Sequence, residues 1–210
     1  MPKKGDRKHR EPLGDPHDPH GWHKTTEQFF EWMEVTNYSP ATIKSRRTYL
    51  GFFIKWALER GLNQPCEITK PILERYQRYL FTYRKKNGEP LSIRGQHTRI
   101  TPLRAFFKWT AKQNITLYNP SSELDLPRME HRLPKHVLNE QEVEKVMGTP
   151  DLQDPLGIRD RAVLETFYST GMRRMELIHL KIHDIDAERG TVMIRQGKGR
   201  KDRQRSESEH

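Results

Sequence analysis

A short proline-rich segment, residues 119–134, constrains the fold of this chain more than any other feature of the sequence. It holds three prolines among polar and charged residues, and proline neither continues a helix nor donates to a β-ladder. Such a segment is extended and typically joins two units that fold separately. We therefore expect a helical domain at 24–118, a linker at 119–134 and a second domain at 135–210.

Four stretches of the first unit have the spacing of amphipathic helices, with apolar residues three and four positions apart. Helix signals border them. Ser39 and Pro40 suit the N-cap and the first position of the second stretch, and Gly61 suits its end. Short connections favour antiparallel neighbours, which predicts a mainly α fold with a four-helix domain. The expected helices cover residues 25–35, 41–60, 70–86 and 92–113.

Residues 1–23 carry four prolines among charges and histidines and have little apolar surface to bury. We expect this basic tail to be disordered. His17, His20 and His23 have a spacing that could suit a metal ion, but metal ligands need a rigid surrounding shell that this tail does not offer. We therefore expect no metal site.

The second unit begins with three helical stretches, at 140–147, 158–168 and 173–180. The pattern then changes to a short stretch rich in β-branched residues, at 191–194, between two turns. The second of these turns is Gly197-Lys198-Gly199, where the two glycines allow a close backbone approach. This order predicts helices followed by a β-hairpin, the start of a mixed α/β domain.

The formal net charge is +10 and the isoelectric point is about 9.7, which points to a polyanionic partner such as nucleic acid. From charge alone, a helical protein-interaction domain with an incidental basic surface remains an alternative. Cys66 is the only cysteine, and no apolar run approaches the roughly 20 residues of a membrane span, so we expect a cytoplasmic protein. The candidate DNA-binding residues are Lys44, Arg46, Arg47, Arg94, Arg99, Arg104, Arg200, Lys201 and Arg203.

Two motifs of the second unit follow one another in a specific order. The first is Thr170-Gly171-Met172-Arg173, with Glu176-Leu177 three residues later, and the second is the Gly-Lys-Gly turn, which follows after one short strand. By charge alone the turn would be an exposed basic hairpin without a specific role. In this order the motifs resemble the tyrosine recombinase, or phage integrase, family, above all its Xer-type members. The first unit and the linker match the same pattern, and the resemblance covers residues 25–203.

The resemblance implies a SAM-like, helical core-binding domain followed by a mixed α/β catalytic domain that acts on double-stranded DNA. Arg173 would hold the scissile phosphate, Glu176 would support the active-site arginines, and Lys198 would protonate the leaving 5′-oxygen. Members of the family use no metal or other cofactor, form a covalent 3′-phosphotyrosine and assemble on DNA as tetramers.

This sequence departs from the family pattern after Arg203. No His-x-x-Arg motif and no tyrosine follow, and all seven tyrosines precede Lys198. We expect a chain that stops within the catalytic domain, binds DNA and does not cleave it alone. The alternative is a non-enzymatic DNA-binding regulator that competes for recombination sites.

Overall fold

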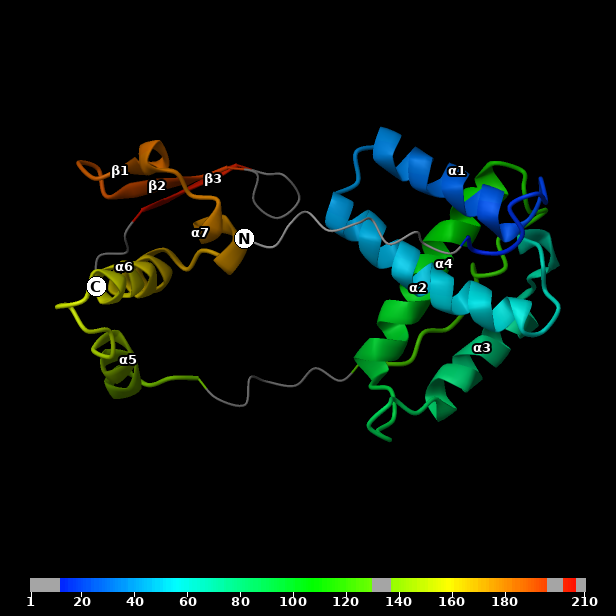
Figure 1. The fold of residues 1–210 in the computed structure, drawn as a ribbon, viewed down its shortest axis with the longest axis horizontal. Coiled ribbons are helices and arrows are strands. Elements are labelled where there is room, and N and C mark those ends of the chain that lie inside the picture. Colours follow the sequence, from blue (N-terminus) through cyan, green and yellow to red (C-terminus); the bar gives the residue numbers. More distant parts are fainter. Residues whose placement is uncertain (1–11, 130–136, 196–201, 207–210) are drawn as a thin grey trace. The chain divides into compact units, whose positions relative to one another are not determined.

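The computed structural model of the chain describes residues 12–129, 137–195 and 202–206 (Figure 1). The chain divides into two compact units, Met1–His131 and Arg132–His210. The boundary falls inside the segment in which the prolines predict a linker. The fold is mainly helical with one small sheet, as the sequence predicts.

Unit 1 is built from the four predicted helices. Helix α2 packs against both α1 and α4, and α3 packs against α4. Ser39 and Ser92 cap two of the helices, because their side-chain oxygens accept the backbone N–H groups of Thr42 at 3.2 Å and Gly95 at 3.1 Å. The helices are α1 (Trp22–Val35), α2 (Pro40–Leu58), α3 (Lys70–Thr82) and α4 (Ile93–Lys112), with a 3₁₀ turn, η1 (Pro65–Glu67), before α3.

Helix α3 ends at Thr82, four residues before the expected end. The chain instead forms a tight turn, in which the N–H of Lys85 donates to the carbonyl of Glu89 at 2.9 Å. Gly88 supplies the left-handed conformation of this turn, with a φ of 80°. The turn takes over the backbone hydrogen bonds that a longer helix would have used.

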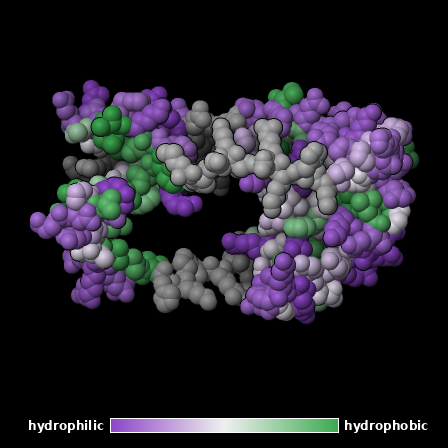
Figure 2. Space-filling model, viewed as in Figure 1, coloured by the Kyte–Doolittle hydropathy of each residue, from purple (hydrophilic) through white to green (hydrophobic). Residues whose placement is uncertain are grey.

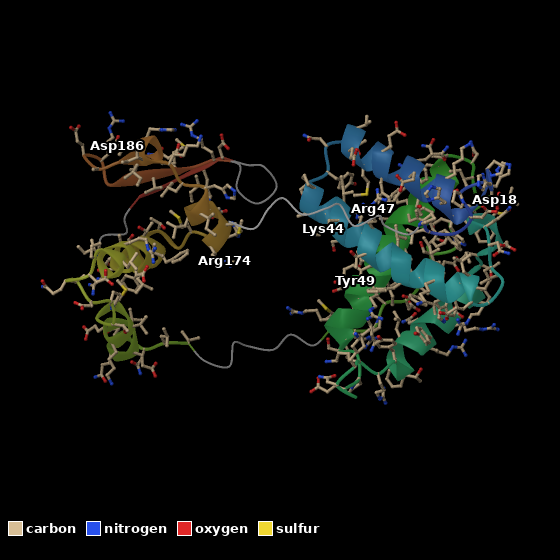
Figure 3. All side chains as sticks on the ribbon, in the orientation of Figure 1. Asp18, Lys44, Arg47, Tyr49, Arg174 and Asp186 are labelled. Carbon is tan, nitrogen blue, oxygen red and sulfur yellow. The ribbon has the colours of Figure 1, made fainter. Side chains whose placement is uncertain are left out.

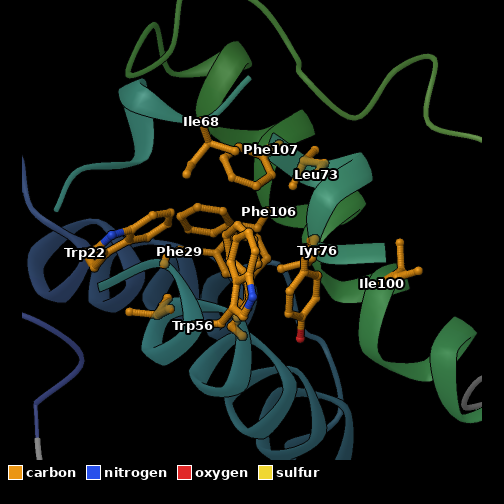
Figure 4. Packing of buried hydrophobic residues seen from close by; sticks show 14 of the residues in the cluster. Trp22, Phe29, Trp56, Ile68, Leu73, Tyr76, Ile100, Phe106 and Phe107 are labelled. Atoms are coloured by element: carbon orange, nitrogen blue, oxygen red, sulfur yellow. The ribbon is translucent and has the colours of Figure 1, made fainter. Parts of the chain in front are cut away.

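Aromatic side chains form the centre of unit 1 (Figure 4). The ring of Phe29 lies edge-on to Phe106, with centroids 5.3 Å apart, and Phe53 lies edge-on to Tyr76 at 4.9 Å. Such edge-to-face pairs add about 0.5–1.5 kcal/mol each beyond the burial of their area. The sequence assigned most of the aromatic residues to a core, and these rings lie in it.

The expectation of a disordered tail is wrong for residues 12–23. Trp22 is wholly buried at the start of α1, and its indole N–H donates to the carbonyl of Leu62 at 2.9 Å. Leu13 packs against the same core, and the Asp18 carboxylate accepts a hydrogen bond from the Gln64 side chain at 3.0 Å. One large apolar side chain therefore orders a polar stretch that composition alone assigns to disorder. Residues 1–11 lie outside the described part of the chain.

The first half of the expected linker is packed onto unit 1. Leu124 is buried in the core, and the carbonyl of Asp125 accepts a hydrogen bond from the Gln77 side chain at 2.9 Å. Further along, the ring of His97 is hydrogen-bonded to the carbonyl of Pro127. Residues 119–127 thus lie along the helical unit, and the end of the segment, 130–134, is outside the described residues.

Unit 2 combines short helices with a three-stranded antiparallel sheet in the order β1-β2-β3. Ile194 of β2 lies opposite Arg203 of β3, and the Gly-Lys-Gly motif lies between these strands in the sequence, outside the described residues. The buried cluster here is small, with Met172, Val192 and Ile194 at its centre. The elements are α5 (Glu140–Met147), α6 (Pro155–Thr170), α7 (Arg174–Ile178), the 3₁₀ turn η2 (Ile182–Asp184), β1 (Ile185–Asp186), β2 (Thr191–Ile194) and β3 (Arg203–Ser206).

We expect Trp22→Ala to lower the free energy of unfolding of unit 1 by about 3–5 kcal/mol, because it leaves a large cavity in a close-packed aromatic core. Val35→Ala at the exposed end of the same helix should change it by less than about 0.5 kcal/mol. Urea unfolding followed by tryptophan fluorescence measures both, since all four tryptophans lie in unit 1. Equal effects of the two substitutions would mean that Trp22 does not belong to the core.

Candidate active site

The position of Arg173 follows from how helix α6 ends. Gly171 has a φ of 57°, and its N–H donates to the carbonyl of Phe167 at 3.0 Å. Glycine adopts this left-handed conformation without strain, so the helix stops there. The next residue, Met172, is buried in the small cluster of unit 2. Arg173 then comes directly before α7, with about half of its side chain exposed.

The carboxylate of Glu176 binds two arginines at once. One oxygen accepts the Arg173 guanidinium at 3.1 Å, and the other accepts the backbone N–H of Arg173 at 2.8 Å. That second oxygen also accepts Nη2 of Arg203, which lies 27 residues further along the chain, at 2.6 Å. The Glu176 side chain is only 6% exposed, so these bonds are shielded from water. Glu176 therefore ties the start of α7 to strand β3.

This environment changes the acidity of Glu176. The backbone N–H of Arg173, together with the guanidinium groups of Arg173 and Arg203, lowers the pKa of the Glu176 carboxyl below its ordinary value of 4.5, although burial acts in the opposite direction. The carboxylate is therefore ionised at neutral pH, as a bridge between two guanidinium groups requires.

A second buried carboxylate holds the other side of the hairpin. Asp184 accepts Nε of Arg195 at 2.6 Å, and its other oxygen accepts the backbone N–H of Lys181 at 3.1 Å. The hydrogen bond from Arg195 is the largest cause that lowers the pKa of Asp184. Arg195 directly follows β2 and Arg203 begins β3. Both ends of the hairpin turn are thus fixed by ion pairs to buried carboxylates.

The structure brings together only some of the site residues that the sequence predicts. Arg173 and Glu176 are in contact, and Arg203, predicted to bind DNA, also contacts Glu176. Three further predicted residues, Lys198, Arg200 and Lys201, lie outside the described residues. The Asp184–Arg195 pair was not anticipated, because the pairing of strands that brings such residues together leaves no periodic signal in the sequence.

The predicted DNA-binding residues of unit 1 fall into two groups. Lys44, Arg94 and Arg104 are exposed on α2 and α4. The other three guanidinium groups lie over aromatic rings, where cation–π contact restricts their motion. Arg46 lies over Tyr38 at 4.8 Å, Arg47 over Phe30 at 4.1 Å, and Arg99 over both Phe52 and Tyr83 at 4.8 and 4.6 Å.

Arg47 has a further partner, since its Nη1 lies 2.6 Å from the carboxylate of Glu27 on α1. Lys44 and Arg47 both project from α2 (Figure 3). Of these two, Lys44 is the more available to a phosphate, because Arg47 already neutralises a carboxylate. Within the described part of the chain, no helix is both long enough and apolar enough to cross a membrane.

Comparison with known proteins identifies both units. Residues 136–208 match the model of the phage integrase family, and residues 26–117 match that of the phage integrase N-terminal SAM-like domain. Tyrosine recombinase XerC 2 of Ralstonia nicotianae is 50% identical over 177 residues, which cover 84% of this chain and 51% of that protein. Tyrosine recombinase XerC of Oceanobacillus iheyensis is 32% identical over 176 residues, with coverages of 83% and 55%.

Solved structures share the fold. XerH bound to a palindromic difH substrate superposes with a TM-score of 0.59 and 23% identity, covering 86% of this chain and 52% of that one. A lambda integrase dimer bound to a core site superposes with a TM-score of 0.61 and 17% identity, with coverages of 88% and 61%. The chain spans about half the length of the curated relatives it matches. Its two family domains and its similarity to both relatives show that the chain belongs to the tyrosine recombinase family, whose members recombine DNA.

Proposed function

We propose that this chain binds double-stranded DNA through unit 1 and holds a DNA phosphate with Arg173 of unit 2. The observation that carries the proposal is the half-exposed Arg173 guanidinium on a buried carboxylate. Nη1 of Arg173 donates to the Glu176 carboxylate, and among the described residues Arg173 has no other side-chain partner. A guanidinium has five N–H donors in a planar fork that matches phosphate oxygens, so the remaining donors suit that ligand.

Unit 1 supplies the larger part of the affinity in this proposal. Lys44, Arg94 and Arg104 are exposed cations that can neutralise backbone phosphates. The stacked Arg46 and Arg99 lose less conformational freedom on binding, because aromatic rings already restrict them. Contacts of this kind set position and affinity and carry no base preference by themselves.

In this proposal Lys198 is the general acid, a role that rests on the family resemblance alone. The proposal also includes assembly with further copies of the chain on DNA and a cytoplasmic location. A positioned ammonium can protonate a leaving oxygen, and Arg173 stabilises the charge that develops on the phosphate.

We further propose that the chain does not cleave DNA by itself. Phosphoryl transfer needs a nucleophile in line with the leaving oxygen, and the seven tyrosines all precede Lys198, whereas the family nucleophile follows it. Tyr76 in particular is buried in the core of unit 1, where burial raises the pKa of its hydroxyl.

Binding of duplex DNA should weaken steeply as salt increases, with a logarithmic slope of about −0.9 for each phosphate neutralised. We expect Lys44→Ala and Arg104→Ala each to reduce this slope by about one, in a fluorescence-anisotropy titration at several salt concentrations. Lys24→Ala, an exposed cation on α1, is the control. Binding that does not respond to salt would contradict a phosphate-based interface.

Glu176→Gln should reduce the acid sensitivity of unit 2. A carboxyl whose pKa is lowered on folding stabilises the fold above its ordinary value of 4.5, and this contribution disappears as the pH falls through the lowered pKa. Stability followed through the methyl NMR signal of buried Met172 should therefore fall less steeply below pH 4.5 in the variant.

The dependence of stability on pH that remains in Glu176→Gln has a second source, because Arg195 also lowers the pKa of Asp184. Combining Glu176→Gln with Asp184→Asn should flatten the profile further than either substitution alone. A profile for Glu176→Gln as steep as that of the unchanged chain would show that the carboxylate is not the bridging group.

No covalent protein–DNA adduct should form when the purified chain is incubated with a nicked suicide duplex that carries its cognate site. The groups of such a site act as a unit, so a missing nucleophile removes far more than its share of the rate. A denaturing gel reads the result, and a full-length recombinase on its own site is the positive control. A shifted band that disappears on changing one of the chain's tyrosines to phenylalanine would overturn the expectation.

A further inference from the structure

Aromatic side chains lie on the surface of unit 1 as well as in its core. The face of this unit that Figure 2 shows is mostly hydrophilic. Phe52 of α2 is nevertheless 46% exposed and Tyr79 of α3 is 37% exposed, while Tyr49 and Tyr83 are half-buried. These four rings are available to a ligand and have no part in the phosphate contacts described above.

The rings are joined to one another through arginine. The ring centroid of Tyr49 lies 6.2 Å from that of Phe52 on the same helix. The Arg99 guanidinium, from α4, lies over the ring of Phe52 at 4.8 Å and over that of Tyr83 at 4.6 Å. Residues from α2, α4 and the end of α3 therefore form one continuous surface.

Tyr79 continues this surface and fixes it to the core. Its ring lies 5.9 Å from that of Tyr83, and the Arg60 guanidinium lies over it at the same distance. Tyr79 also stacks on the buried Tyr76, with centroids 6.0 Å and ring planes 26° apart. The rings are thus held in place before a ligand binds, so little conformational freedom is lost on binding. We name six surface residues the aromatic strip: Tyr49, Phe52, Arg60, Tyr79, Tyr83 and Arg99.

The surface around the aromatic strip is strongly basic. Residues 70–99, which contain α3 and the start of α4, hold eight basic and two acidic residues. Three of the basic ones, Arg75, Arg78 and Lys86, are exposed and have no carboxylate partner in the described part of the chain. Exposed rings among unpaired cations fit a polyanion that carries flat groups of its own, and a nucleic acid has both.

We propose that the aromatic strip binds a single DNA strand by stacking its unpaired bases on the rings. In a duplex the faces of each base are covered by its neighbours, so a protein ring cannot reach them, whereas an unpaired strand exposes them. A guanidinium stacks on flat rings and also attracts phosphates, so Arg60 and Arg99 suit the same ligand. The inference goes beyond the proposed function, because it concerns a different form of DNA, and only Arg99 belongs to the predicted duplex-binding residues.

The test is a fluorescence-anisotropy titration with two labelled strands, an oligothymidylate of about 16 nucleotides and an abasic strand of the same length. The abasic strand has the same phosphates and no bases to stack. The chain should bind the oligothymidylate about fivefold or more tightly than the abasic strand, because one stacked base contributes at least that factor. Tyr79→Ala should weaken binding of the oligothymidylate by a similar factor, and Tyr79→Phe, which keeps the ring, should not.

Phe81→Ala is the matched control. Phe81 is 71% exposed on the same helix but lies about 200° around it from Tyr79, away from the aromatic strip. This substitution removes an exposed ring of similar size, so it should leave binding of the oligothymidylate unchanged.

Folding and duplex binding are measured on the same samples. Tyr79→Ala should remain folded in a urea titration followed by tryptophan fluorescence, and it should keep its salt-dependent duplex binding; if it unfolds, Phe52→Ala replaces it. A chain that binds the oligothymidylate but no duplex would contradict the proposed function and still support the aromatic strip. The inference is overturned if the abasic strand binds as tightly as the oligothymidylate, or if Phe81→Ala weakens binding as much as Tyr79→Ala. It is also overturned if light scattering shows a dimer that Tyr79→Ala dissociates, since a second copy would then cover the strip.

Discussion

The shared carboxylate of Glu176 is the interaction on which the organisation of unit 2 depends. Helix α7 has five residues and the sheet has strands of two to four, so neither is stable through its own length. Glu176 joins them by binding the N–H and guanidinium of Arg173 and the guanidinium of Arg203. Removing the carboxylate would leave the partly buried Arg203 guanidinium without its counter-charge, so the two arginines depend on the same group.

Asp184 repeats the same arrangement on the other side of the hairpin, since it holds Arg195 as Glu176 holds Arg203. The two arginines lie at the end of β2 and the start of β3. Arg195 pairs with Asp184 of η2, and Arg203 pairs with Glu176 of α7. The hairpin is therefore positioned relative to Arg173 by these ion pairs together with the small apolar cluster of Met172, Val192 and Ile194. Unit 1 is organised in the opposite way, around twenty buried apolar residues rich in aromatic rings.

The helical unit could be predicted from the sequence because caps and apolar spacing are local signals, and Ser39, Pro40 and the apolar stripes lie where they indicate helices. The ordering of residues 12–23 could not be predicted from the sequence. It depends on a single tryptophan, Trp22, whose indole donates a hydrogen bond to the carbonyl of Leu62, 40 residues further along the chain. Arg173 and Glu176 could be paired because they are three residues apart at the start of a helix. The contacts Arg203–Glu176 and Arg195–Asp184 could not, because they depend on strand pairing over 27 and 11 residues.

The two units thus orient their arginines by different physical means. In unit 1 the aromatic faces of Tyr38, Phe52 and Tyr83 restrict Arg46 and Arg99. In unit 2 the carboxylates of Glu176 and Asp184 orient the arginines, and these carboxylates lose their charge in acid. Acid therefore acts on the orientation of Arg173 and the hairpin through the carboxylates of Glu176 and Asp184. In the proposed function, salt weakens the phosphate contacts of both units.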